Sequence, residues 1–370
     1  MSSKEQTDVE KYDENMRPGG PGEEPLTWHA PDESPFELAG FAWHGSDRIY
    51  RRLPLNPNHK LSEAVDTLAN YTAGGQIRFQ TDSSRLSIRV QLAGPSGMVH
   101  MPATGQSGFD CYIGPPGHQR YYRTTTFDPT QDSYECQLLA APTVETRNIT
   151  LNFPLYQGVK EVMIGLEPDA AVLPPLPYRT DKRVIVYGTS ITQGGCACRP
   201  GMATSNILSR YLNVEFINLG FSGSGKGEPE MARNMAEIAR PGCFVLDYEG
   251  NAGAAGVRQT FAEFIRILRE AHPAVPILAV SAIRYAHETV DPAAPQKRME
   301  TRDFQRQTIE TLREQGDKNL CFFDGGELLG SDYDECTVDG VHPTDLGFMR
   351  MANGLAPTLE EILFATSNNS

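Results

Sequence analysis

Short stretches in which apolar and polar residues alternate dominate the first half of the chain. Clear examples are Leu86–Leu92, Ile149–Phe153 and Val159–Ile164, and clusters of Gly, Pro, Asn and Asp separate such stretches. A period of two residues is typical of strands with one buried face, because successive side chains point to opposite faces of a sheet. The pattern therefore predicts an all-β sandwich domain over residues 27–172.

The second half of the chain alternates continuous apolar runs with helical periodicity. The runs that predict strands are Val184–Tyr187, Val214–Leu219, Phe244–Tyr248, Ile277–Ser281 and Leu320–Asp324. The predicted helices are Thr204–Tyr211, Glu228–Ala239, Gly256–Glu270, Gln296–Gln315 and Thr344–Phe364. Strict alternation of strand and helix predicts an α/β fold over residues 181–370, with a flavodoxin-like, doubly wound parallel sheet covered by helices on both faces.

Two segments fit neither pattern. Residues 1–26 are rich in acidic residues, Gly and Pro, and contain no apolar cluster, which predicts a disordered, solvated tail. Residues 173–180 hold closely spaced prolines, which stiffen a chain and cannot continue a strand ladder, so we interpret them as a linker between the two domains.

Charge and composition indicate which binding partners the protein is not expected to have. The net charge of −14 would repel nucleic acid and anionic membranes, so we expect neither as a partner. No apolar run reaches the roughly 20 residues of a membrane helix. The N-terminus lacks the apolar segment of a secretory signal, which predicts a cytoplasmic protein. The chain has seven cysteines, an odd number that suits a reducing compartment better than a disulfide framework. The sequence leaves open whether the protein forms a homo-oligomer.

Polar residues that could carry chemistry follow the predicted parallel strands. Ser190 ends the first strand, Gly223 lies in a glycine-rich segment after the second, and Asn251 follows the third. Asp339 and His342 lie three residues apart before the last helix, so both can sit on one turn. Ligands bind at the carboxyl ends of parallel strands, and a serine hydroxyl there needs a base such as histidine to become a nucleophile.

Each of these features, taken singly, also fits a simpler role. Ser, Asn and Gly are ordinary turn residues, and the glycine-rich segment could bind a phosphate. Its glycine spacing does not match G-x-G-x-x-G and no Walker lysine follows, which argues against a nucleotide site and against a flavodoxin-like redox protein. Cys196 and Cys198 could suggest a metal or redox pair, but no second pair accompanies them.

Taken together and in this order, the segments resemble the four sequence blocks of the SGNH or GDSL hydrolases. They are G-T-S-I-T at 188–192, N-L-G-F-S-G at 218–223, G-N at 250–251 and D-G-V-H-P at 339–343, within a match of about residues 183–357. The resemblance implies that Ser190 is the nucleophile, that Asp339 and His342 complete the triad, and that Ser190, Gly223 and Asn251 form the oxyanion hole. Thr189 stands where the first block usually has Asp, and Ala252 stands where the third block usually has Asp.

A second resemblance lies in the first half of the chain. Gly108-Phe109-Asp110-Cys111-Tyr112 is similar to the G-x-D-L-Y signature of a β-sandwich domain found in front of some SGNH hydrolases. The segment 194–202 resembles a stretch typical of the same subgroup. Within it, Arg199 is a candidate for binding a substrate oxygen or carboxylate, or else a structural arginine that bonds loop carbonyls.

These resemblances imply a serine esterase that removes short acyl groups, acetyl foremost, from a carbohydrate or a similar small hydroxylated ester. No metal and no organic cofactor is expected. An acyltransferase that moves an acyl group onto an alcohol of a natural product would use the same residues. A catalytically silent carbohydrate-binding protein is a further alternative, because fold alone does not determine function.

Overall fold

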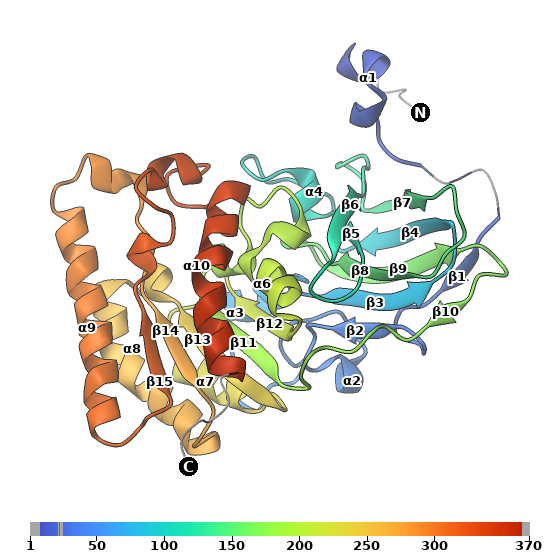
Figure 1. Cartoon of the computed structure of the whole chain (residues 1–370). Helices are drawn as coiled ribbons and strands as arrows, with labels where there is room; N and C mark the ends of the chain where they lie inside the picture. Colours follow the sequence, from blue (N-terminus) through green and yellow to red (C-terminus); the bar gives the residue numbers. More distant parts are fainter. Residues whose placement is uncertain (1–7, 21, 23–24, 365–370) are drawn as a thin grey trace.

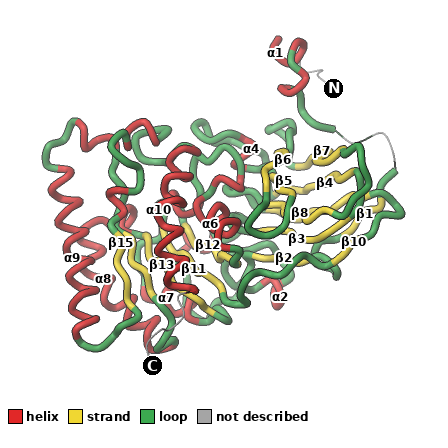
Figure 2. The backbone as a smooth tube through the Cα atoms, viewed as in Figure 1, coloured by secondary structure: helices red, strands yellow, loops and turns green. Residues whose placement is uncertain are grey.

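The computed structural model describes residues 8–20, 22 and 25–364, and it contains two antiparallel sheets beside one parallel sheet covered by helices (Figure 1). The two antiparallel sheets come from the first half of the chain and form a sandwich. The parallel sheet and its long helices come from the second half, as the separate groups of strands in Figure 2 show. The predicted fold class, an all-β sandwich followed by a flavodoxin-like α/β domain, is confirmed.

The sandwich consists of a four-stranded and a six-stranded sheet. The first has the order β1-β9-β4-β7 and contains β1 (Thr27–His29), β4 (Arg85–Leu92), β7 (Ser133–Ala140) and β9 (Val159–Leu166). The second contains, in order, β10 (Val172–Leu173), β3 (Gln76–Thr81), β8 (Arg147–Asn152), β5 (Asp110–Ile113) and β6 (Arg120–Thr124), with β2 (Glu37–Ala39) beside β3. Alternate residues of β4, from Leu86 to Leu92, are buried in the core between the sheets, which accounts for the period of two in the sequence.

The parallel sheet has the strand order β12-β11-β13-β14-β15. Its strands are β11 (Arg183–Gly188), β12 (Glu215–Gly220), β13 (Pro241–Asp247), β14 (Ile277–Val280) and β15 (Leu320–Phe323). Counted from the first strand of this domain, the order is 2-1-3-4-5, that of the flavodoxin-like sheet. Val184 and Val186 pack on one face of β11, whereas Ile185 and Tyr187 pack on the other, so the strand is buried on both sides.

Five helices cover the parallel sheet. Residues of α6 (Thr204–Leu212) and α10 (Asp345–Phe364) share one apolar core with it, and residues of α7 (Pro229–Ala236), α8 (Glu249–Ala271) and α9 (Ala294–Glu314) share the other. The third predicted helix begins earlier than the sequence indicated. α8 starts at Glu249 and bends at Gly253, whose φ of 61° interrupts the helical path, so Asn251 lies in a first helical turn instead of a loop.

The predicted tail is only partly described, whereas the predicted linker is described in full. Residues 1–7, 21 and 23–24 of the tail, and 365–370 at the other end, lie outside the described residues. The described part of the tail contains α1 (Asp8–Tyr12) and η1 (Glu14–Met16), and the Gly19 N–H donates to the Thr126 carbonyl at 2.9 Å. The proline-rich segment runs from β10 to β11, and the Arg78 guanidinium lies 3.6 Å from the Tyr178 ring centre at its end.

One segment of the first half packs on the parallel sheet instead of on the sandwich. Beyond the tail, the short helices of the first half are α2 (His44–Asp47), α3 (Glu63–Leu68) and α4 (Ala103–Gln106). Leu53 and Val65 belong to the same core as α7 and α8. The fully buried Arg52 guanidinium donates to the carbonyl groups of Asn218 and Gly220, at the end of β12. The first half of the chain therefore completes the core of the second.

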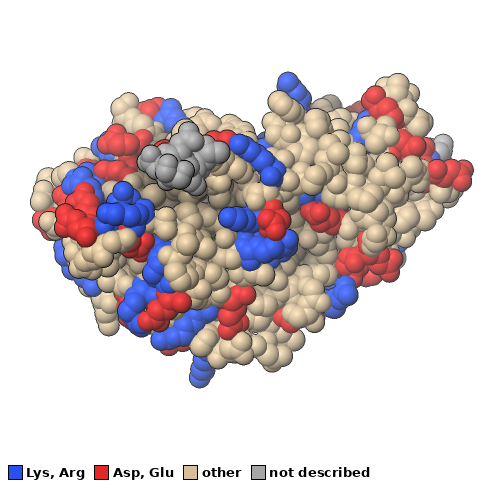
Figure 3. Space-filling view, turned by 60° about the horizontal axis from the view of Figure 1, so that its bottom comes forward, with Lys and Arg blue, Asp and Glu red and all other residues tan. Residues whose placement is uncertain are grey.

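The surface carries charges of both signs. On the face seen in Figure 3, Lys and Arg side chains are interspersed with Asp and Glu side chains. Within the described part of the chain, no helix combines the length and the apolar character that a membrane crossing requires.

Candidate active site

Ser190 lies where β11 passes directly into a short helix. Thr189 caps this helix, α5 (Ser190–Gln193): its hydroxyl accepts the Ile191 N–H at 3.2 Å, and the Thr192 hydroxyl accepts the Thr189 N–H at 3.1 Å. This reciprocal capping box fixes the first turn. Thr189, which replaces the usual Asp of the block, therefore acts as a helix cap.

Three predicted residues form one continuous chain of hydrogen bonds. The Ser190 hydroxyl donates to His342 Nε2 at 2.8 Å, and His342 Nδ1 donates to Asp339 Oδ2 at 2.7 Å. Asp339 Oδ1 accepts the backbone N–H groups of Val341 at 3.0 Å and of His342 at 2.8 Å. An imidazole held in this way can accept the serine proton, because the carboxylate fixes its tautomer and stabilises the imidazolium.

The charge of Asp339 supports this tautomer. Partial burial acts to raise the pKa of the carboxyl group, but the backbone N–H of His342, its ring and the Val341 N–H all donate to it and lower that pKa to about 2. The carboxylate is therefore ionised at neutral pH. An ionised carboxylate only accepts hydrogen bonds, so Nδ1 must carry the ring proton and Nε2 is left as the acceptor that faces Ser190.

The two other predicted donors lie on neighbouring loops. The Asn251 side-chain N–H donates to the Phe221 carbonyl at 3.0 Å, which places it against the loop that carries Gly223. That loop contacts α5, because the Ser222 N–H donates to Gln193 Oε1 at 3.1 Å. Gly223 has a φ of 67°, a conformation that favours glycine, and a Cβ atom there would meet nothing within 4 Å. Its backbone therefore faces open space.

The Arg199 side chain makes its hydrogen bonds with the sandwich domain instead of with Ser190, Asp339 or His342. Its guanidinium lies 3.3 Å from Asp110 Oδ2 and 3.9 Å from the ring centre of Tyr121, both in the sandwich. The same Asp110 oxygen accepts the Gly201 N–H at 2.7 Å, and Asp110 is fully buried. The aspartate of the Gly108–Tyr112 signature thus holds the loop that follows α5. The Arg199 guanidinium donates to the side chains of Asp110 and Tyr112 in the sandwich, instead of to the loop carbonyls of the structural alternative.

The sandwich also supplies residues that sequence reasoning missed. His100 lies beside the catalytic candidates, with its Nε2 3.9 Å from Asp339 Oδ2 and its ring centre 5.8 Å from that of His342. The Tyr156 hydroxyl donates to the Ser190 carbonyl at 3.1 Å. No motif or spacing in the sequence connects these residues to Ser190, because the contacts depend on how the sandwich docks.

His100 belongs to a group with metal-ligating atoms. One ligand atom each from His100, Cys196 and His342 lies within 4.8 Å of the others, the one such group that the described part of the chain contains. Cys196 is 4% exposed. Cys198, the other cysteine of the candidate pair in the sequence, is not a member of the group. The group thus combines two imidazoles and a thiol, and one of the imidazoles is that of the candidate base, His342.

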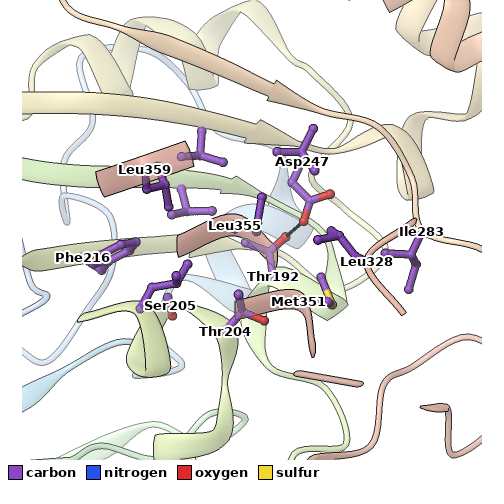
Figure 4. Close-up of a pocket in the computed structure, with 14 residues that line it drawn as sticks. Thr192, Thr204, Ser205, Phe216, Asp247, Ile283, Leu328, Met351, Leu355 and Leu359 are labelled. Carbon is purple, nitrogen blue, oxygen red and sulfur yellow. Dashed lines mark hydrogen bonds between the residues drawn. The ribbon is translucent and has the colours of Figure 1, made fainter. Parts of the chain in front are cut away.

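A mainly apolar pocket is lined by Thr192 of α5 and by residues of the parallel sheet and α10 (Figure 4). Its volume is about 30 Å³, room for an ordered water. At one end the Thr192 hydroxyl donates to Asp247 Oδ2 at 2.9 Å. Burial raises the pKa of Asp247 to about 7, although the Thr192 hydrogen bond acts to lower it. Ser190, Asp339 and His342 do not line this pocket, so it is separate from the space in which an ester would meet the serine.

Comparison with protein families gives two matches that together span most of the chain. Residues 181–360 match the GDSL-like lipase/acylhydrolase family, and residues 26–172 match the GxDLY domain, the N-terminus of SGNH hydrolase-type esterases. No curated protein matches this chain.

Several solved structures resemble the whole chain. A protein from Bacteroides ovatus, described as a GDSL-like lipase, is 30% identical over 92% of this chain and 98% of its own, with a TM-score of 0.83. A salicylyl-acyltransferase from a tetracycline biosynthetic pathway is 20% identical over 92% and 99% of the two chains (TM-score 0.73). A family two carbohydrate esterase from Clostridium thermocellum, solved with cellohexaose, is 14% identical over 78% and 92% (TM-score 0.55). The last two share the fold.

Proposed function

The chain belongs to the GDSL-like lipase/acylhydrolase family, with the N-terminal domain of SGNH-type esterases in front, and we propose that it is a serine esterase that removes short acyl groups, acetyl foremost, from a carbohydrate or a similar hydroxylated ester. The observation that carries this proposal is the hydrogen-bonded chain from the Ser190 hydroxyl through His342 to Asp339, with distances of 2.8 and 2.7 Å.

In the proposed reaction the Ser190 oxygen attacks the ester carbonyl while His342 Nε2 takes the hydroxyl proton. Asp339 stabilises the imidazolium that forms. The imidazolium then returns the proton to the alcohol oxygen as the carbon–oxygen bond of the ester breaks. Water, deprotonated by the same imidazole, releases the acyl group as a carboxylic acid and restores the serine.

The oxyanion of the tetrahedral intermediate requires donors that are fixed before the reaction. We assign this role to the backbone N–H groups of Ser190 and Gly223 and to the Asn251 amide. Neither the Ser190 N–H nor the Gly223 N–H has a hydrogen-bond acceptor among the described residues. One N–H of the Asn251 amide is engaged with Phe221, which orients the group and leaves its second N–H for the substrate. Removal of one such donor typically costs about 2.7–4 kcal/mol in the transition state.

The choice of substrate rests on similarity to known proteins. The fold shared with a carbohydrate esterase supports a hydroxylated alcohol component. The fold shared with an acyltransferase, which extends over 92% of this chain, favours as second candidate the transfer of the acyl group to an alcohol instead of water. Both reactions would use the same Ser190, Asp339 and His342, and they differ in whether water or the acceptor alcohol attacks the acyl-enzyme.

The decisive experiment measures deacylation of a panel of acetylated sugars and oligosaccharides, with Ser190→Ala as control. We expect acetate release by the wild-type protein and none by the variant, which should keep the wild-type fold. Fluorophosphonate labelling should be lost in Ser190→Ala and retained in Ser224→Ala, a partly exposed serine of the neighbouring loop. Wild-type turnover by Ser190→Ala would overturn the assignment of the nucleophile.

Two further measurements address the substrate. Turnover of p-nitrophenyl esters from acetyl to decanoyl should be highest at acetyl, and a maximum at decanoyl would contradict the preference for short acyl groups. Product analysis with and without candidate alcohol acceptors separates hydrolysis from transfer. A new ester that forms only with the acceptor would establish the acyltransferase reaction.

A further inference from the structure

We propose that His100, Cys196 and His342 form a binding site for a borderline-soft divalent metal ion such as Zn²⁺, and that metal bound there stops the esterase reaction reversibly. The first part of this proposal depends only on the three side chains. The second part rests on the proposed function, because it requires His342 to be the base for Ser190.

The spacing of the ligand atoms is close to that of a zinc site. They lie within 4.8 Å of one another, whereas bonds of about 2.0–2.3 Å to a tetrahedral zinc place ligand atoms roughly 3.5 Å apart. The His100 side chain is 37% exposed, so it can rotate toward the other two. Cys196 is buried and follows Gly195, where an added Cβ atom would lie only 3.2 Å from His342 Cδ2, so this part of the backbone lies directly against the His342 ring.

The surroundings of His342 resemble those of a histidine that ligates zinc. Such histidines usually donate their second ring N–H to a carboxylate, which fixes the tautomer and makes the free nitrogen a better ligand. His342 Nδ1 donates to Asp339 at 2.7 Å, so Nε2 is the nitrogen that faces a metal. Nε2 is also the atom that accepts the Ser190 hydroxyl at 2.8 Å. Metal and serine therefore compete for the same lone pair.

The donor set determines which ions should bind. Two imidazoles and a thiolate suit Zn²⁺ and Co²⁺ better than Mg²⁺ or Ca²⁺, which prefer oxygen ligands. Three protein ligands leave a fourth position for water. Binding converts the Cys196 thiol to a thiolate, and the released proton passes to the solvent. No oxidation or reduction takes place, so a chelator should reverse the binding completely.

Inhibition by Zn²⁺ is the first measurement. Hydrolysis of p-nitrophenyl acetate by chelator-treated protein should fall with micromolar Zn²⁺ and recover with EDTA, while Mg²⁺ should have no effect. His100→Ala and Cys196→Ser, each compared with its own metal-free rate, should raise the half-inhibitory concentration at least tenfold. His118→Ala and Cys198→Ser, which change a histidine and a cysteine outside the group, should leave it unchanged. Equal inhibition of all four variants would overturn the site.

Direct binding is the second measurement, and it does not depend on catalysis. Co²⁺ added to Ser190→Ala, which keeps all three ligands, should produce a thiolate-to-cobalt charge-transfer absorption that disappears in the Ser190→Ala/Cys196→Ser double variant. If this absorption appears and the wild-type protein hydrolyses no ester, the metal site stands and the proposed function fails. If the absorption is absent while Ser190-dependent hydrolysis is present, the proposed function stands and the metal site is refuted.

Discussion

The Asp339→Asn variant tests how the carboxylate controls the neighbouring imidazole. Asp339 Oδ1 accepts two backbone N–H groups, at 3.0 and 2.8 Å, so the oxygen of an asparagine must occupy that side. Its NH₂ group then faces His342 Nδ1, where the carboxylate now accepts at 2.7 Å. Two donors cannot face each other, so the ring proton must move to Nε2. In that tautomer Nε2 faces Ser190 as a donor and cannot take its proton.

The expected loss follows from this change of tautomer. In serine proteases the equivalent substitution reduces kcat about 10⁴-fold while geometry is retained. At about 1.36 kcal/mol per factor of ten, this corresponds to roughly 5.5 kcal/mol of transition-state stabilisation. We expect a reduction of the same order here. KM for a small ester should change little, because Asp339 lies on the far side of His342 from the serine.

Initial rates with p-nitrophenyl acetate, together with thermal unfolding, provide the assay. Asp334→Asn, an exposed aspartate of the same segment, is the matched control and should retain wild-type kcat. A value of kcat for Asp339→Asn within tenfold of wild type, with the fold intact, would show that the carboxylate does not set the tautomer. Our assignment of the base would then be wrong.

Three other predictions concern the donors, the domain contact and acid stability. Asn251→Ala should lower kcat about 10²–10³-fold with little change in KM, and an unchanged kcat would remove Asn251 from the oxyanion hole. Asp110→Ala leaves the Arg199 guanidinium and the Gly201 N–H without their buried acceptor, so urea unfolding should show a loss of about 3 kcal/mol; a loss below about 1 kcal/mol would contradict this role. Asp339 has a folded-state pKa of about 2 against an ordinary value of 3.8, so it contributes stability that is present above about pH 4 and is lost as the pH falls toward 2. Because the side chain is about one-third exposed, we expect only about 1 kcal/mol, and urea unfolding of Asp339→Asn should lack this pH dependence.

Much of the fold was predictable because it depends on local pattern. The continuous apolar run Val184–Tyr187 reflects a strand that is buried on both faces. The period of two in Leu86–Leu92 reflects a strand with one face in the core of the sandwich. Both kinds of burial are visible in the sequence. The start of α8 was not predictable in this way. Its first turn holds Gly250 and Asn251, residues that ordinarily favour turns, and tertiary contacts such as that of Asn251 with Phe221 override this preference.

The candidate site was predictable only in part, for a related reason. Ser190, Asp339 and His342 lie in segments whose order along the chain carries a family resemblance, and the structure places them within hydrogen-bond distance. His100 and Tyr156 approach the same place from the other domain. Their positions follow from the docking of the sandwich, which no short-range pattern in the sequence encodes.

The burial of Arg52 has a consequence for how this chain unfolds. Its guanidinium donates to the carbonyl groups of Leu68 and Tyr71 from its own half and of Asn218 and Gly220 from the other. Separation of the halves would remove two of its four carbonyl acceptors and expose the apolar surface that Leu53 and Val65 share with α7 and α8. We therefore expect the two domains to unfold as one cooperative unit. The proline-rich segment at residues 173–180 marks a boundary in the path of the chain, but we do not expect it to divide the molecule into parts that are stable by themselves.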